Sequence, residues 1–582
     1  MRRIATLALL GLFLAGPAAA QTPTETLTGV ITGTRTLNAG TVYLLDGEVY
    51  VDNGATLNVP AGTVIKGRQN PSAGRGEASV LVVQRGGTIN ATGTAADPII
   101  FTAEADDVAD PFDTNESQQG LWGGVILLGN ASNNRGERSI EGLTPENPRV
   151  LFGPSAAFPQ DDDDNSGVMR YVSIRHAGFT RTPNEEINGL TLGAVGRGTT
   201  LEYVEVFANS DDSFEFFGGT VNGKYLAGTF GGDDDIDWDQ GYTGNLQFVF
   251  SLKNESGQIG RCIEGDGAAS PFTAALLSDP TVSNLTCIGS GLGSDPGGSD
   301  AGGPALKLRE NTRGAIYNSV FIDFQTTAGG IDLEIQPEDD AGNPVGDATI
   351  STAQNFREGE LVIKNNLFFD FSVGNTPAAI VRRDLADIEA TVAADNRFES
   401  ASLVGVGRDQ GGRLDPRPTA GSTAATGADF GFDRLDGDFF TEVDYLGAFA
   451  PVGATEDGDD DDATPADDSV WLKGWTALDQ MNYLSRLSVP TEGGPEAAFT
   501  LAVGPNPSSA AATVRFTLDR AQTVRVALYD ALGREVAVVA DGTFGAGTTT
   551  ARVDAGALPA GVYVLRLQGE GTSVSRQISV VR

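Results

Sequence analysis

A repeat of 22 residues most limits how this chain can fold. In residues 209–244, a group of acids, an alternation of acidic and apolar residues and a glycine occur twice. Asp212 is thus followed after 22 residues by Asp234, and Phe214 likewise by Ile236. A period in this range is typical of solenoids, in which each repeat buries its apolar face against its neighbours. The spacing predicts that Phe214 and Ile236 lie inside a coil, one above the other.

A third, less regular copy follows at 262–266, where Ile263 takes the inward position. Because successive strand residues point to opposite sides, the acids between these apolar positions would face outward. Acids from three coils would then form one column. The predicted metal ligands are Asp211, Asp212, Glu215, Asp233, Asp234, Asp235, Asp237, Glu264 and Asp266.

Such a column implies a cation. Neighbouring strands lie about 4.8 Å apart, and carboxylates at that spacing cannot all stay ionised without a positive partner. Ligand sets made only of oxygen select hard ions such as Ca²⁺. An alternative is that these acids cap turns, accept backbone N–H bonds and keep the edge of the coil solvated. The sequence leaves both interpretations open.

The composition narrows the class of protein and its partners. The chain of 582 residues has 76 glycines and many short runs rich in Val, Ile and Thr, which favours β-structure with tight turns. Its 78 acids against 39 bases give a formal charge of −39, which disfavours nucleic acid and anionic membranes as partners. The single histidine, His176, argues against a Ser-His-Asp triad or a histidine zinc site, and we expect it to be a turn residue or a satisfied hydrogen-bond partner.

The ends of the chain predict an exported protein with two domains. Residues 1–20 combine two arginines, an apolar run and a small-residue end, as a secretory signal peptide does, and no later segment is apolar enough to span a bilayer. We expect a parallel β-helix over 21–487, a linker over 488–498 and a small β-sandwich over 499–582, so the fold class is all-β. In an exported protein, a disulfide between Cys262 and Cys287 is favoured over two free thiols.

Recurring residues mark single strands of the coil. Between residues 171 and 248 the recurring residue is aromatic, and between residues 284 and 365 it is asparagine. For the asparagines we expect a hydrogen-bonded ladder inside the solenoid. Two aromatic segments, 439–451 and 470–478, flank an acidic run at 457–468 and are predicted to cover the open end of the coil. The markers are Tyr171, Tyr203, Tyr225, Phe248, Asn284, Asn318 and Asn365.

The last domain resembles the C-terminal sorting domain of type IX secretion cargo. The resemblance covers 499–582 and rests on Pro505-Asn-Pro507, Leu528-Tyr-Asp-Ala-Leu-Gly533, Leu558-Pro-Ala-Gly-Val-Tyr563 and the final Ile578-Ser-Val-Val-Arg582. It implies that the type IX machinery is a partner and that the protein reaches the outer cell surface or the medium.

Residues 28–475 resemble secreted right-handed parallel β-helix proteins of the Bacteroidetes type, with a pectin-lyase-like solenoid. The matching stretches include Leu57-Asn-Val-Pro-Ala-Gly-Thr-Val-Ile-Lys66, Gly120-Leu-Trp-Gly-Gly124 and residues 233–244. The resemblance implies a fold and no particular activity.

Two functions remain open from the sequence. The first is a binding or structural protein whose cation-stabilised acidic face engages a polysaccharide. The second is a carbohydrate-active enzyme: a Ca²⁺-dependent lyase with Arg309 as the base, or a glycoside hydrolase using two of Asp212, Asp237 and Glu264. The sequence names neither the ligand nor the substrate.

Overall fold

The computed structural model describes most of the chain in two compact units, residues 1–486 and 487–582, which we treat separately. The predicted signal peptide (1–20), acidic run (457–468) and linker (488–498) lie outside the described residues. The described residues are 23–454, 470–485 and 499–580, except 183–184, 259, 269–270, 298–301, 339–342, 384, 505–510, 519–521, 530–533, 546, 555, 557, 560 and 570–572.

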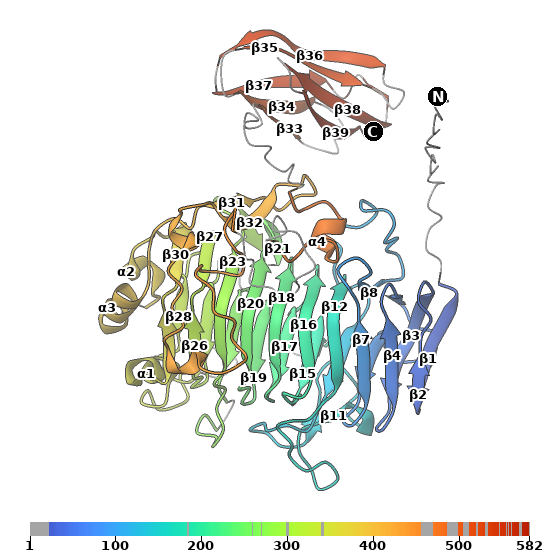
Figure 1. Ribbon diagram of the computed structural model, residues 1–582, viewed down its shortest axis with the longest axis vertical. Coiled ribbons are helices and arrows are strands. Elements are labelled where there is room, and N and C mark those ends of the chain that lie inside the picture. Colours follow the sequence, from blue (N-terminus) through green and yellow to red (C-terminus); the bar gives the residue numbers. More distant parts are fainter. Residues whose placement is uncertain are drawn as a thin grey trace, which may run out of the picture. The chain divides into compact units, whose positions relative to one another are not determined.

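The first unit is a parallel β-helix, as predicted, and its strands form three walls (Figure 1). The first wall consists of β1 (Glu25–Ile31), β3 (Val42–Val51), β6 (Val80–Val83), β9 (Gly124–Leu128), β15 (Leu190–Gly193), β17 (Phe214–Phe217), β19 (Ile236–Asp239), β22 (Ile263–Asp266), β25 (Leu306–Arg309) and β28 (Ile331–Leu333). The second contains β2 (Thr34–Thr36), β4 (Thr56–Pro60), β7 (Thr88–Thr92), β26 (Gly314–Tyr317) and β29 (Leu361–Lys364). The third contains β5 (Val64–Gly67), β8 (Ile99–Ala103), β27 (Val320–Phe324) and β30 (Leu367–Phe371), with the early parts of β1 and β3. Long strands bend from the second wall into the third: β12 (Gly167–Arg175), β16 (Thr200–Phe207), β18 (Asn222–Thr229), β20 (Asn245–Leu252) and β23 (Thr281–Ile288).

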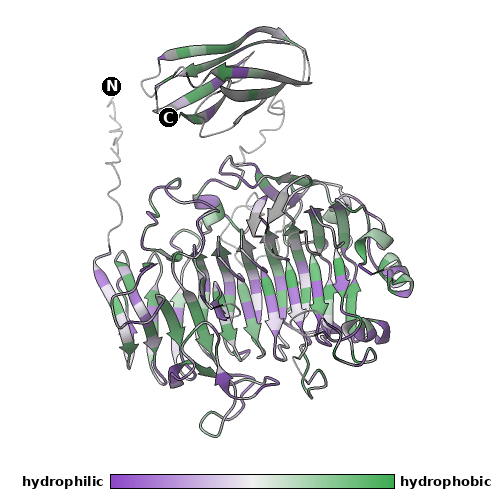
Figure 2. Ribbon diagram, turned by 180° about the vertical axis from the view of Figure 1, so that it is seen from behind, coloured by the Kyte–Doolittle hydropathy of each residue, from purple (hydrophilic) through white to green (hydrophobic). Residues whose placement is uncertain are grey.

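The register of the first wall confirms the predicted repeat. Phe214 pairs with Ile236, and Ile236 pairs with Ile263. All three side chains are at most 1% exposed and belong to one core. Figure 2 shows the hydrophilic and hydrophobic residues that alternate along the strands. The coil is therefore held by apolar side chains that stack in columns along its interior.

The recurring aromatic and asparagine markers occupy one corner of the coil, where the second wall turns into the third. Their φ angles lie between 51° and 57°, in the left-handed region. Asparagine tolerates this conformation better than other side chains, whereas a bulky aromatic residue adopts it at a cost of about 1–2 kcal/mol. The rings offset that cost by stacking: Tyr203 lies 4.4 Å from Tyr171 and 4.3 Å from Tyr225, between ring centroids.

The asparagine ladder is present only in part. Asn365 donates to Asn318 at 2.8 Å, but Asn284 and Asn318 donate to the carbonyls of Tyr445 and Asp429. These carbonyls belong to a segment that we call the lateral strap, the described residues 424–454 and 470–484. The corner side chains thus bond across to the strap rather than forming a continuous internal ladder.

The strap runs along the side of the coil, so the prediction that its aromatic segments cover the open end is wrong. The Gly447 amide donates to the Asn318 carbonyl at 2.8 Å, while Trp475 packs edge-on against Tyr171 and Tyr203 at 5.8 and 6.3 Å. The aromatic corner leaves a long apolar surface outside the coil, and burying that surface is the physical reason for the strap's position.

Three short helices instead pack beside the last strands, as the left side of Figure 1 shows. Their apolar residues, among them Phe356, Ile380 and Ile388, join the interior core. The sequence shows no helical pattern here, because each helix is short and buries only one or two apolar residues. The helices are α1 (Thr352–Glu358), α2 (Pro377–Ile380) and α3 (Ala386–Asp395), and the strap carries α4 (Ala477–Gln480).

Insertions between the coils form small separate sheets, and a disulfide crosses the core. Cys262 and Cys287 are bonded, as favoured from the sequence, with a Cα–Cα distance of 6.2 Å and no exposed surface on either residue. The paired insertion strands are β10 (Arg138–Ser139) with β11 (Leu151–Phe152), β13 (Phe179–Thr182) with β14 (Glu185–Ile187), and β21 (Ser256–Gln258) with β24 (Asp295–Gly297). After the last coil, β31 (Leu403–Val406) pairs with β32 (Leu414–Pro418).

The second unit is an antiparallel β-sandwich, as expected. Val514, Phe516, Val526 and Leu565 lie in its shared core and are fully buried. One sheet contains β33 (Phe499–Gly504), β34 (Ala511–Leu518) and β37 (Gly547–Asp554). The other contains β36 (Glu535–Phe544), β35 (Gln522–Tyr529), β38 (Gly561–Gln568) and β39 (Ser573–Val580).

Candidate functional site

The outward-facing side chains of the first wall form a column of polar residues. Glu215 on β17 pairs in register with Asp237 on β19, which pairs with Glu264 on β22. The column begins with Thr191 on β15 and continues beyond Glu264 to Lys307 and Asp332. The predicted alignment of acids from successive coils is therefore what the backbone register produces.

Five of the nine predicted ligands gather into what we call the acid cluster: Asp211, Asp212, Glu215, Asp233 and Asp237. It comprises two groups of three that share Asp212, and in each group one oxygen per residue lies within 4.8 Å of the others. One group adds Asp211 and Asp233, and the other adds Glu215 and Asp237. The acidic side chains therefore meet at a spacing that could hold a metal ion.

Burial makes the acid cluster electrostatically costly. Asp212 is 8% exposed and Glu215 7%, so neither carboxylate is well hydrated. Burial, reinforced by neighbouring carboxylates, raises the pKa of Asp211, Asp212, Glu215 and Asp237 well above the ordinary range. Among the described residues, no lysine or arginine forms an ion pair with these four. The cluster must therefore take up either protons or a cation.

Two buried oxygen atoms in this column lack a hydrogen-bond partner within the described part of the chain. They are the hydroxyl oxygen of Thr191, which is 1% exposed, and Oδ1 of Asp237. Thr191 lies next to Glu215 in the register, so its side chain projects from the same face of the wall. Buried polar atoms are nearly always satisfied, and unpaired ones beside carboxylates fit the oxygen ligands of a cation.

A residue from outside the repeat also reaches the cluster. The side-chain amide of Asn188 donates from Nδ2 to the carboxylates of both Glu215 and Glu141, and its Oδ1 accepts a bond from the Asp212 backbone amide at 3.2 Å. Burial raises the pKa of Glu141 to about 7. Glu141 also lines a cavity of about 150 Å³, together with Glu185 and Gln240. No periodic signal indicated Glu141, because this residue belongs to an inserted loop.

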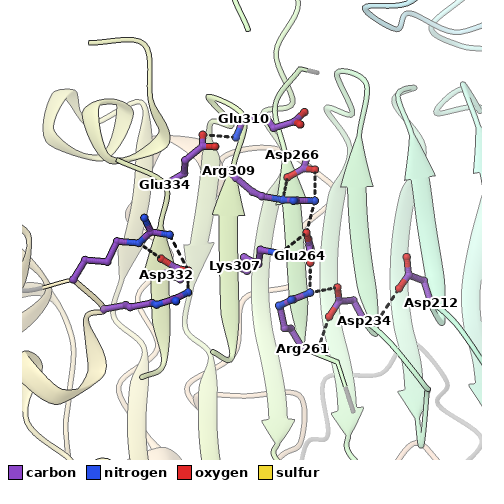
Figure 3. A network of polar contacts seen from close by, with 12 residues as sticks. Asp212, Asp234, Arg261, Glu264, Asp266, Lys307, Arg309, Glu310, Asp332 and Glu334 are labelled. Carbon is purple, nitrogen blue, oxygen red and sulfur yellow. Dashed lines mark hydrogen bonds and ion pairs between the residues drawn. The ribbon is translucent and has the colours of Figure 1, made fainter. Parts of the chain in front are cut away.

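The predicted ligands Asp234, Glu264 and Asp266 lie beside the acid cluster in a charge-balanced network, which the Asp234 amide joins to the Asp212 carboxylate (Figure 3). Arg261 bonds Asp234 at 3.0 Å and also contacts Glu264. Arg309 pairs with both Glu264 and Asp266. The remaining member, Lys307, lies 3.2 Å from Glu264. Three carboxylates thus face three cations, so this network has no need of a metal ion.

The pKa shifts follow this division. Burial favours a higher pKa for Asp234, but Arg261, followed by Lys253, holds that pKa below its ordinary value. For Glu264, burial and the Asp234 charge outweigh Arg309 and Arg261 and raise the pKa to about 8. The ninth predicted ligand, Asp235, is fully buried and pairs with Lys253 at 3.1 Å. We therefore leave Asp234, Asp235, Glu264 and Asp266 out of the candidate metal site.

Comparison with protein families agrees with this architecture. A family described as the pectate-lyase like beta helix domain matches residues 29–407, which is more than half of the chain. The chain belongs to this β-helix family. A secretion system C-terminal sorting domain matches residues 502–581. No curated protein matches the chain.

The sorting domain sets the destination of this β-helix protein. It identifies the chain as cargo of the type IX secretion machinery, exported to the cell surface or the medium. Within the described residues, no helix is both long enough and apolar enough to cross a membrane. The β-helix domain that carries the acid cluster is therefore exported.

The structure contradicts one predicted catalytic role in the β-helix domain. Arg309 was a candidate base, but it is bonded to Asp266 through two nitrogens, each at 2.9 Å. Burial lowers the pKa of Arg309, but the charges of Asp266, Glu264 and Asp237 raise it above its ordinary value. Arg309 also follows Asp266 in the register, one column away from Glu264. It cannot give up a proton readily, and its ion pairs are with Glu264 and Asp266.

His176 is a turn residue, as expected. It has a φ of 57°, no exposed surface, and Nδ1 at 2.6 Å from the Gln118 carbonyl. Burial lowers its pKa, so the ring is neutral and Nδ1 donates this bond. Its position at a closed corner fits a structural role.

Proposed function

We propose that this exported β-helix protein binds Ca²⁺ between Asp212, Glu215 and Asp237, and that the ion stabilises its first wall. The observation that carries the proposal is the shared position of two buried carboxylates and one partly buried carboxylate, none of them ion-paired to a basic side chain of the described residues, beside the unpartnered oxygen of Thr191. Three carboxylate oxygens within 4.8 Å of one another suit a Ca²⁺ ion, whose bonds to oxygen are about 2.3–2.6 Å long. A smaller Mg²⁺ ion demands shorter bonds and stricter geometry.

For its role outside the cell, we propose binding or structural support rather than catalysis. A glycoside hydrolase needs two carboxyl groups that flank a bound sugar, whereas two of its three candidates, Asp212 and Glu264, are more than nine-tenths buried. The long regular walls of a solenoid suit an extended ligand, and a polysaccharide is the ligand class that we propose. Retention on a polysaccharide panel without release of product supports this role, and turnover in the presence of Ca²⁺ contradicts it.

The mature protein should melt at a higher temperature with Ca²⁺ than with a chelator. A ligand that binds only the folded state at one hundred times its Kd stabilises it by about 2.7 kcal/mol. The measurement is a thermal melt at pH 7.5, with excess Ca²⁺ and with EDTA. Repeated at pH 5, the increase should be smaller, because protons compete for carboxylates whose pKa is raised.

Substitution of Asp237 should distinguish the stabilising effect of a bound ion from the destabilising effect of carboxylate repulsion. Asp237→Asn removes a repelling carboxylate, so without Ca²⁺ its melting temperature should equal or exceed that of the wild type, while its response to Ca²⁺ is largely lost. The control is Glu202→Gln, which alters a side chain that is 37% exposed on the second wall and should leave the response intact. An undiminished response in Asp237→Asn refutes the proposed site.

A further inference from the structure

Lys253 is buried with its ammonium group against a buried carboxylate. Its side chain, directly after β20, is 1% exposed, and that of Asp235, directly before β19, has no exposed surface. Lys253 Nζ lies 3.1 Å from Asp235 Oδ2. We propose that these two side chains condense into an amide, an isopeptide bond, which joins the two ends of one coil.

The next coil is closed by a covalent bond at the corresponding place. Asp235 and Cys262 directly precede residues that pair in the first wall, so they occupy equivalent positions in successive coils. Cys262 is bonded to Cys287, which pairs in register with Ser251. The Ser251 hydroxyl in turn donates to the Asp235 carboxylate. The junction of the third and first walls is thus bridged by a disulfide in one coil, and by Lys253 and Asp235 in the coil before it.

The surroundings of Asp235 suit the attack of an amine on its carboxyl carbon. Ser213 donates to Oδ1 at 3.0 Å, and Ser251 donates to Oδ2. Lys253 Nζ also donates to the Asp233 carbonyl at 2.7 Å, which fixes it beside the carboxyl group. Two groups held in contact react as though each were at a very high concentration. The hydroxyl donor at Oδ1 stabilises the negative charge that develops there during the attack.

The condensation balances without an added reactant. Within the pair, the ammonium gives one proton to Oδ2, and the resulting amine attacks Cγ of Asp235 to form the C–N bond. A second proton passes from nitrogen to Oδ2, the bond between Cγ and Oδ2 breaks, and Oδ2 leaves as water with the bonding electron pair. One ammonium and one carboxylate thus become one amide and one water molecule. The product is uncharged, which suits a site that excludes water.

Burial distinguishes this pair from an exposed lysine–aspartate pair. Lys364 and Asp395 also lie in contact, at 3.3 Å, but their side chains are 41% and 31% exposed. Water around them stabilises both charges, so the ionised pair is favoured there. Lys364 should therefore keep a free ammonium group, and it serves as an internal control.

A tryptic digest of the exported protein, with its disulfide reduced and alkylated, tests the proposal. Trypsin does not cut after a lysine whose Nζ is part of an amide. Residues 225–261 should therefore remain one peptide, lighter than its sequence by one water molecule, while the chain is cut normally after Lys364. Lys253→Arg keeps a positive charge but cannot form this amide, so it should give 225–253 and 254–261 at full mass. Asp235→Asn should give the same linked peptide as the wild type, because its amide loses ammonia in place of water.

Only resistance to trypsin and loss of water together support the isopeptide bond. Peptides 225–253 and 254–261 at full mass, with no linked form, overturn it. A succinimide at an aspartate also loses water but leaves Lys253 open to trypsin, so loss of water with normal cutting overturns it as well. These results come from the wild-type chain and do not depend on whether a variant folds. They are also independent of Ca²⁺, because neither residue is a proposed ligand.

Discussion

Replacing Arg261 with methionine is expected to destabilise the β-helix unit by about 3–5 kcal/mol at neutral pH. Arg261 is 4% exposed and lies between Asp234 and Glu264, which are 3% and 7% exposed. Removing one partner of a buried ion pair leaves an uncompensated charge, and the loss exceeds that from a surface pair by several fold. Urea unfolding of the mature chain at pH 7.5 measures the effect.

The pH dependence of this effect has a defined sign. Arg261 lowers the pKa of Asp234, so the pair contributes stability above the ordinary aspartate pKa, about 3.9, and loses it as the pH falls through the lower folded value. The difference between wild type and Arg261→Met should therefore shrink on acidification. The matched control is Arg313→Met, which breaks an exposed pair with Glu360 and should cost about 1 kcal/mol or less. An equal loss in both variants contradicts the buried network.

Trp475→Ala is expected to lower the free energy of unfolding by about 3–5 kcal/mol, because it removes the indole ring that packs the lateral strap against the aromatic corner. Trp475 has no exposed surface, packs edge-on against Tyr171 and Tyr203, and donates from Nε1 to the Trp471 carbonyl at 2.7 Å. The free energy of unfolding in urea measures the loss, and limited proteolysis shows whether the strap is cut first.

The aromatic corner and the acid cluster lie on different walls, so the response to Ca²⁺ serves as a control for Trp475→Ala. Trp475→Ala should retain the rise in melting temperature with Ca²⁺, because its contacts are at the junction of the second and third walls. Phe112→Ala, at a side chain that is 60% exposed, should change stability by less than about 0.5 kcal/mol. Resistance of the strap to protease in Trp475→Ala would count against its dependence on this contact.

Regular features of the coil could be predicted because they repeat. The step from Phe214 to Ile236 fixes both the interior column and, by alternation, the outward position of Glu215 and Asp237. The left-handed corner was visible as a recurring aromatic or asparagine residue, although its backbone conformation was not. Periodicity thus predicts which residues occupy equivalent positions in successive coils.

Features outside the repeat were not predictable in the same way. Arg261 and Lys253 come from the inserted segments between strands, and no spacing indicated that they neutralise Asp234 and Asp235. Glu141 reaches the cluster from a loop, and the strap contacts strands more than 100 residues earlier in the chain. Such contacts depend on how an insertion folds back on the coil, which a one-dimensional pattern does not specify.

The most direct test of the central claim, that stacked coils create a cation site, is a crystal structure with Ca²⁺ and an anomalous difference map. A peak about 2.3–2.6 Å from carboxylate oxygens of Asp212, Glu215 and Asp237 is the predicted result. A map with no peak there under saturating Ca²⁺, with the three side chains ordered, contradicts the account.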